Sequence, residues 1–135
     1  MQRYSWILCL LAIGLLPVAA RAGVVADLQA GYQQQGAGMF RAEQGERLFR
    51  QRVAASGAAE GGSCSDCHGA DPSQPGKHLR TGKAIAPLSP WRDPARLQDA
   101  AKVEKWFLRN CKGTLGRECT PQEKGDFLSY LTSVR

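Results

Sequence analysis

Apolar residues recur at helical spacing in four stretches of the chain, and no long stretch alternates as a half-buried strand does. The first two stretches predict a short helix over residues 24–35, ended by glycines, and a second helix over residues 42–53. In the second stretch Gly45 stands one turn before Phe49. A glycine and an aromatic residue on one helix permit another helix to cross it closely.

The other two predicted helices lie near the C-terminus. Residues 100–110 carry Val103, Trp106, Phe107 and Asn110 at positions i, i+3, i+4 and i+7, with Asp99 or the Asp93-Pro94 pair as helix starts. The sequence Thr120-Pro121-Gln122-Glu123 forms a capping box with proline in the first turn, so the last helix is predicted to run to about residue 133. The predicted fold class is all-α.

The sequence Cys64-Ser65-Asp66-Cys67-His68 reads C-x-x-C-H, which is the attachment motif of a c-type haem. Two thiols at this spacing can bond the haem vinyl groups, and the adjacent His68 can supply the proximal nitrogen to iron. The alternatives are a thioredoxin-like dithiol, for which no βαβ pattern is present, and a zinc site completed by Cys111 and Cys119. The motif favours one covalent haem c, bound through Cys64 and Cys67.

Residues 69–94 contain five of the seven prolines. A loop of this length without regular structure is uncommon in a compact domain unless it wraps something, and haem would be that group. Ile85, Pro87 and Leu88 are then natural contacts of the haem ring, and Trp106 and Phe107 are predicted to line the distal side of the pocket. The alternative is a partly mobile linker.

Residues 1–22 resemble a cleaved secretory signal peptide, with Arg3, an apolar run over residues 7–16 and an Ala20-Arg21-Ala22 cleavage site. The alternative, a membrane anchor, is disfavoured because the apolar run is too short to span a bilayer. Cleavage would leave a single domain over residues 23–135, exported to the periplasm and not inserted in the membrane. That domain has 16 Lys and Arg against 12 Asp and Glu, a mild excess that indicates no nucleic-acid surface but could steer an acidic protein partner.

After cleavage, Cys111 and Cys119 remain as an even pair in an oxidising compartment. A disulfide is favoured over two buried free thiols.

The sixth iron ligand is not evident, because no Met follows the haem motif. His78 is the only other His, and it can be either a second axial ligand or a loop residue that is solvated or contacts a propionate. Asn110 can point inward with its apolar stripe, where its amide would need a partner, or it can cap the C-terminal end of its helix.

Several segments, taken together and in order, resemble SHP (sphaeroides haem protein) and its relatives, which are small high-spin class I c-type cytochromes. The resemblance covers roughly residue 44 to the C-terminus and is carried by residues 62–64, 67–72, 81–83, 86–88, 102–107, 109–111, 116–120 and 123–124. It implies a class I cytochrome c-like helical domain around one haem. It also implies that Asn110 is the distal ligand, that Cys111 and Cys119 form a disulfide, and that the asparagine leaves on reduction so that small diatomics bind the iron.

The resemblance further implies a dihaem cytochrome c and a membrane cytochrome b as redox partners. The protein itself is expected to be a monomer. The leading hypothesis is therefore a periplasmic electron-transfer cytochrome whose ferrous haem binds O₂, NO or CO. The runner-up is a bis-His electron carrier with His78 as ligand. An enzyme that reduces peroxide or nitrogen oxides is third, because no distal His/Arg pair is identifiable, although Arg109 and Arg117 lie near the proposed site in sequence.

Overall fold

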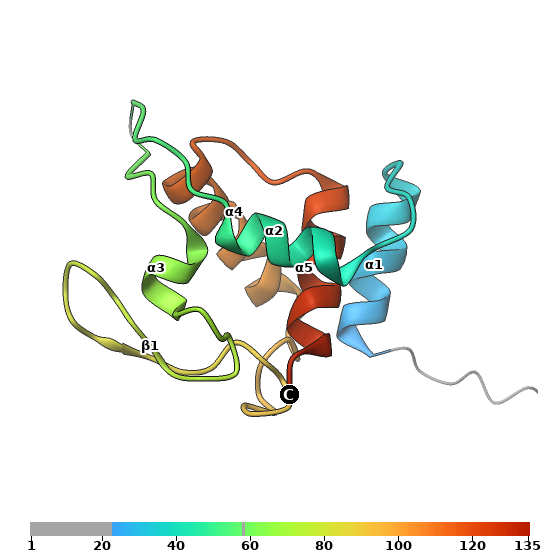
Figure 1. Ribbon diagram of the computed structural model, residues 1–135. Coiled ribbons are helices and arrows are strands. Elements are labelled where there is room, and N and C mark those ends of the chain that lie inside the picture. Colours follow the sequence, from blue (N-terminus) through green and yellow to red (C-terminus); the bar gives the residue numbers. More distant parts are fainter. Residues whose placement is uncertain (1–22, 58) are drawn as a thin grey trace, which may run out of the picture.

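The computed structural model describes residues 23–57 and 59–135, and Figure 1 shows its helices packed around a central crossing. The predicted signal peptide lies outside the described residues. In the described part, no helix is long and apolar enough to cross a membrane. The elements are α1 (Val24–Gln34), α2 (Ala42–Arg50), α3 (Cys64–His68), β1 (Gly76–Lys77), β2 (Ala84–Ile85), α4 (Ala100–Leu115) and α5 (Pro121–Ser133).

The N-terminal helices lie close to their predicted bounds. Helix α2 ends three residues before the predicted end, because the chain turns there and Val53 pairs with Gly62 in an isolated antiparallel bridge. The amide of each of these two residues donates to the carbonyl of the other, at 2.9 and 2.8 Å.

Helix α4 is five residues longer than predicted. It begins at the predicted cap, where the Asp99 side chain accepts a hydrogen bond from the Lys102 amide. It ends at Gly116, whose φ of 72° is the left-handed conformation that glycine adopts readily. Asn110 therefore lies inside the helix, and its predicted alternative role as a C-terminal cap is wrong. The Asp93-Pro94 start forms only a turn, since Leu97 adopts a φ of 58°.

The centre of the core is the crossing of α2 and α5. A side chain at Gly45 would place its Cβ 2.2 Å from the Asp126 carbonyl oxygen and 2.8 Å from the Tyr130 Cβ, so only glycine allows this approach. The ring of the fully buried Phe49 lies 5.6 Å from the Tyr130 ring and 6.1 Å from the Phe127 ring. The close crossing predicted from Gly45 and Phe49 is confirmed.

Helices α1 and α4 pack on other sides of α5. Tyr32, Val103 and Leu128 form one buried cluster. Beside it, the Glu104 carboxylate accepts hydrogen bonds from the Tyr32 hydroxyl and from the Lys124 ammonium group, the second at 2.6 Å. Polar groups at this junction thus satisfy one another, and the helices of the protein form one scaffold before any cofactor is considered.

The segment between α3 and α4 contains the only strands among the described residues. Gly76 pairs with Ile85 and Lys77 with Ala84 in a two-residue antiparallel ladder that the sequence did not predict. Further along, the carbonyl of the fully buried Pro72 accepts from the amides of Leu88 and Ser89, at 2.9 and 3.1 Å. These hydrogen bonds order the proline-rich segment, in contrast to the alternative of a mobile linker.

Candidate haem site

The C-x-x-C-H motif forms the single-turn helix α3, which puts Cys64 beside Cys67 and His68 on one helical face. The Asp66 carboxylate fixes the start of this turn by accepting a hydrogen bond from the Ser63 amide at 2.9 Å. It also pairs with the Arg52 guanidinium at 2.6 Å. The amide of Ser63 and the charge of Arg52 hold the pKa of Asp66 below its usual value, so the carboxylate remains ionised.

Both motif thiols are free and partly buried. Cys64 packs against the cluster of Phe49, Tyr130 and Leu131, and burial raises its pKa to about 11. A protonated, half-buried thiol does not suit thiolate redox chemistry. Zinc is disfavoured as well, because the two further cysteines that a zinc site would need are joined to each other in a disulfide.

His68 is half-buried, and burial lowers its pKa, with the charge of Arg96 lowering it further. The imidazole is therefore neutral at pH 7 and has a lone pair available for a metal. Two thiols and a neutral imidazole on one turn are the donor set that a covalent haem c requires, so these residues fit the group.

Arg96 holds the segment before α4 in place near His68. Its guanidinium donates to the Pro87 carbonyl at 2.8 Å and to the Ala86 carbonyl at 2.9 Å, and it pairs with Asp93 at 3.2 Å. Leu88, one of the predicted haem contacts, packs on the same cluster as Cys64. Ile85 and Pro87, the other predicted contacts in this segment, are half-buried, and Ile85 lies on β2.

The hairpin of β1 and β2 lies directly against the haem motif. A Cβ at Gly76 would stand 2.3 Å from the Cys67 carbonyl oxygen and 2.8 Å from the His68 Cα. Glycine is thus required where the strand passes the motif.

The predicted inward stripe of α4 divides into two faces. Val103 is buried and Phe107 is half-buried, with its ring 5.8 Å from the Phe127 ring of α5. Trp106 is 43% exposed, and Asn110, one turn further along, is exposed as well. Val103 and Phe107 meet α5, whereas Trp106 and Asn110 lie on the neighbouring face of α4, so the haem-pocket role of Trp106 and the ligand role of Asn110 stay predictions.

Trp106, Asn110 and Gly113 follow one another at i, i+4 and i+7 and form a second, open face of α4. A Cβ placed on Gly113 would meet nothing within 4 Å. The Arg109 guanidinium lies 5.0 Å from the Trp106 ring centroid at the border of this face. An exposed stripe that combines a tryptophan ring with an amide is suited to contact with a planar cofactor such as haem.

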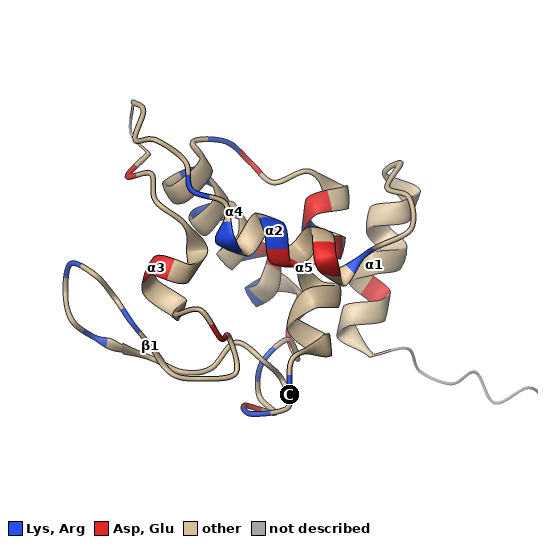
Figure 2. Ribbon diagram, viewed as in Figure 1, with Lys and Arg blue, Asp and Glu red and all other residues tan. Residues whose placement is uncertain are grey.

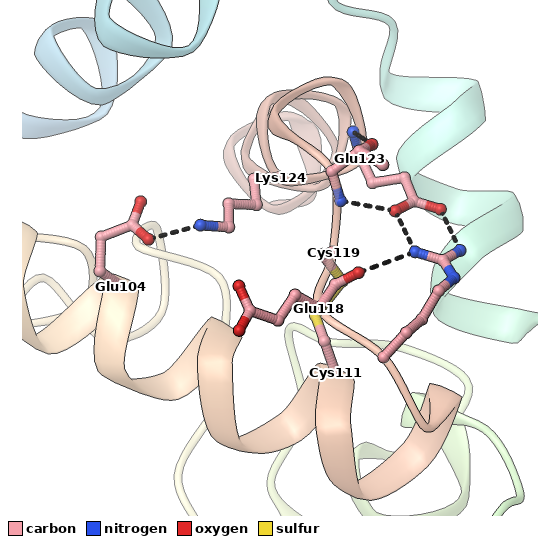
Figure 3. Close-up of a disulfide and its surroundings, with 8 residues drawn as sticks. Glu104, Cys111, Glu118, Cys119, Glu123 and Lys124 are labelled. Atoms are coloured by element: carbon pink, nitrogen blue, oxygen red, sulfur yellow. Dashed lines mark hydrogen bonds and ion pairs between the residues drawn. A yellow bond between two sulfur atoms is a disulfide. The ribbon is translucent and has the colours of Figure 1, made fainter. Parts of the chain in front are cut away.

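The disulfide lies next to Asn110. The structure joins Cys111 to Cys119 with a Cα–Cα distance of 5.6 Å, and both residues are buried with Leu48. Figure 3 shows how the loop after α4 is braced here. Arg117 pairs with Glu123 at 2.6 Å, and the Glu123 carboxylate also accepts from the Thr120 amide at 2.8 Å. The last turns of α4 are therefore fastened to the start of α5.

His78 lies in the turn of the hairpin. Its backbone amide donates to the Lys83 carbonyl at 2.8 Å, and its Nδ1 accepts from the Thr81 amide at 3.3 Å. These contacts are those of a residue that shapes a turn, as in the loop alternative of the sequence analysis.

Three residues of the site were missed by the sequence analysis, namely Asp66, Gly76 and Arg96. Asp66 had a usable signal, since Ser63-x-x-Asp66 has the spacing of a capping box. Gly76 and Arg96 had no such signal, because the backbone atoms that they contact belong to other segments, which no local sequence pattern connects to them.

The helical scaffold and the motif on α3 define a small c-type cytochrome domain. The family model described as "Domain of unknown function (DUF1924)" matches residues 35–131. The chain is 45% identical over 108 residues to the cytochrome c-type protein SHP of Cereibacter sphaeroides, which covers 80% of this chain and 82% of that protein. It is 36% identical over 85 residues to cytochrome c'' of Methylophilus methylotrophus, with 63% of this chain and 59% of that protein covered.

Solved structures give the same result. Oxidized SHP, described as an oxygen binding cytochrome c, aligns with a TM-score of 0.73 at 44% identity and covers 81% of this chain and 96% of its own. Oxidized cytochrome c'' aligns with a TM-score of 0.71 at 28% identity, over 83% and 95% of the two chains. The chain therefore belongs to the DUF1924 family, and its identity to SHP places it among the SHP-like monohaem c-type cytochromes. The predicted family, fold class and haem c cofactor are confirmed.

Proposed function

We propose that this protein is an exported high-spin cytochrome that transfers electrons and binds a small diatomic ligand when reduced. Haem c, held by Cys64, Cys67 and His68, would supply the one-electron couple and an iron centre able to bind a diatomic ligand. Oxygen binding is stated for SHP, and the identity of 45% to that protein supports the same property here. The role of the polypeptide is then to hold the proximal ligand firmly and the distal ligand weakly.

The observation that carries the proposal is the position of Asn110. Its amide lies on an open face of α4, directly before a disulfide that fastens this helix to α5. No Met follows the haem motif in the sequence. Asn110 is thus a well-anchored residue with a coordinating oxygen and, among the described residues, no side-chain hydrogen bond within the fold.

The amide oxygen of Asn110 is a hard, neutral and weak-field donor. Ferric iron is a harder acid than ferrous iron and holds such an oxygen better. With haem bound, Asn110 would hold ferric iron weakly, and on reduction its amide could turn to water or backbone groups that satisfy its four hydrogen-bonding sites. His68 would be the residue that keeps hold of the iron. Trp106 and Phe107, from two neighbouring faces of α4, restrict access of water to the distal side.

Electron transfer rather than catalysis is proposed because the side chains of the two nearby arginines already have partners within the protein. Arg109 stacks on Trp106, and Arg117 pairs with Glu123. The proposed partners are a dihaem cytochrome c or a membrane cytochrome b, as the family resemblance implies, and the protein acts as a monomer in the periplasm. Intact-mass analysis of the secreted protein tests export and haem attachment. The expected result is a chain that begins at Gly23 and carries one haem.

The ligand assignment is tested with two variants. Asn110→Ala keeps covalent haem, changes the ferric visible and EPR spectra, and binds CO in the ferrous state as the wild type does. His78→Ala serves as the matched control and leaves the ferric spectra unchanged. If His78→Ala alone alters the ferric spectra, or if wild-type ferrous protein is low-spin and does not bind CO, a bis-His carrier replaces this proposal.

A further inference from the structure

The hairpin over residues 76–85 carries three cations, Lys77, Arg80 and Lys83, and no Asp or Glu. All three are exposed, and Figure 2 shows basic positions along the loop that bears the label β1. Arg80 pairs with Glu60 at 2.8 Å. Within residues 23–57 and 59–135, no ion pair within 4.0 Å involves Lys77 or Lys83. The surface of this hairpin, here called the basic hairpin, is therefore positively charged.

A cavity of about 520 Å³ lies between the basic hairpin and α3, and Cys67, His78 and Leu79 contribute to its lining. Leu79 is 71% exposed, so an apolar side chain stands among the cations at the rim. Asp66 also borders the cavity, but its charge is offset by Arg52. One exposed leucine alone is ordinary. Here it lies beside the cysteine that would anchor one edge of the haem.

We propose that the basic hairpin is the docking surface for an acidic electron-transfer protein, with Leu79 in an apolar contact and the cations facing carboxylates. The inference rests on the proposed electron-transfer function. It adds where on this protein the partner binds and which charge the partner carries. Transient redox encounters use small interfaces that are steered by opposite charge. Docking at this hairpin would also bring the partner next to Cys67, the predicted attachment residue of the haem. The electron would then cross a short distance between the two proteins.

The test uses reduced flavodoxin as an acidic one-electron donor and the ferric holoprotein as acceptor. In each encounter flavodoxin loses one electron and the haem gains it, and stopped-flow absorbance gives the rate. The double variant Lys77→Glu/Lys83→Glu is compared with Arg47→Glu/Lys105→Glu, which changes the net charge equally at exposed positions of α2 and α4. The hairpin variant is expected to react about tenfold more slowly at low ionic strength, and the control less than about twofold.

Two further measurements separate docking from net charge. Reduction by the methyl viologen radical cation is expected to become faster, not slower, in the hairpin variant, because the sign of the probe is reversed. Leu79→Ser, which changes no charge, is expected to slow the flavodoxin reaction about threefold and to leave the viologen reaction unchanged.

Three results would overturn the inference. The first two are equal slowing of the flavodoxin reaction in both double variants and no slowing in the hairpin variant. The third is tight binding of the wild type to phosphatidylglycerol vesicles that flavodoxin does not displace, because this result would assign the hairpin to a membrane surface. Ferric spectra and ferrous CO binding are recorded on every variant and are expected to match the wild type. If wild type fails to bind CO while the hairpin variants still react slowly, the gas-binding function fails and the docking surface stands.

Discussion

The crossing of α2 and α5 and the segment between α3 and α4 are held together in different ways. At the crossing, Gly45 lies directly against the backbone of Asp126 in α5, and the rings of Phe49 and Tyr130 pack against each other. In the segment, backbone hydrogen bonds to Pro72 and the guanidinium of Arg96 do most of the ordering, and many side chains remain half-exposed. The crossing is a packed hydrophobic core, whereas the segment is ordered by polar contacts and lies against the haem motif of α3.

The comparison predicts the largest loss of stability at the crossing. Gly45→Leu places carbon atoms where the Asp126 carbonyl now lies, so α2 and α5 must separate, at a cost of about 3 kcal/mol or more. Urea unfolding of the holoprotein, followed by far-UV circular dichroism, measures the effect. Gly31→Ala is the control, since its Cβ meets nothing within 4 Å and alanine favours α1 by about 0.5–1 kcal/mol. Equal unfolding midpoints for the two variants would contradict the close crossing.

The second prediction concerns the disulfide, which links the finished core to the open face of α4. Cys111→Ala/Cys119→Ala removes a cross-link of sequence separation 8 and is expected to cost about 2–3 kcal/mol. It should also change the ferric spectrum, since Asn110 loses its anchor. Arg117→Gln, which breaks the exposed pair with Glu123 and the hydrogen bond to the Glu118 carbonyl but keeps the disulfide, is the matched control and should cost less than about 1 kcal/mol. A ferric spectrum identical to that of the wild type would show that the disulfide does not position Asn110.

The third prediction addresses the cofactor-side segment itself. Gly76→Ala forces β1 away from the Cys67 carbonyl and the His68 Cα, with an expected cost of about 2 kcal/mol. Because Gly76 lies against the haem motif and Gly45 does not, the ferrous and ferric absorption bands should shift more in Gly76→Ala than in Gly45→Ala. Thermal unfolding and visible spectra of both variants check this. The comparison of the two regions is wrong if Gly45→Ala perturbs the haem bands more than Gly76→Ala does.

The smallest expected effect is at the start of α5 and depends on pH. Hydrogen bonds from Arg117 and from the Thr120 amide hold the pKa of Glu123 below its usual value. Its contribution to stability is therefore present above the unfolded pKa of about 4.3 and is lost as the pH falls through the lower native pKa. Glu123→Gln is expected to cost about 1 kcal/mol at pH 7 and progressively less below pH 4. Unfolding curves at both pH values measure this difference, with Glu118→Gln as the control; a constant difference would refute the linkage.

Much of the scaffold could be predicted because its signals are local. The capping box of Thr120 and Glu123 and the spacing of Gly45 and Phe49 depend on residues within one or two turns. Where the prediction failed, the spacing of residues within one segment did not contain the deciding information. The end of α4 depended on which glycine could take a left-handed conformation, and the strands β1 and β2 depended on the contact of Gly76 with α3.

The sequence by itself determined that this chain carries a C-x-x-C-H motif, where its main helices begin, and that no Met follows the motif to bind iron. These properties depend on residue identity and short spacing. Only the tertiary structure decided which face of α4 meets α5, and therefore that Trp106 and Asn110 are exposed while the half-buried Phe107 packs against Phe127 of α5. Helical periodicity fixes which residues share a face, but the direction of that face is set by the partner helix, which the pattern along one segment does not contain.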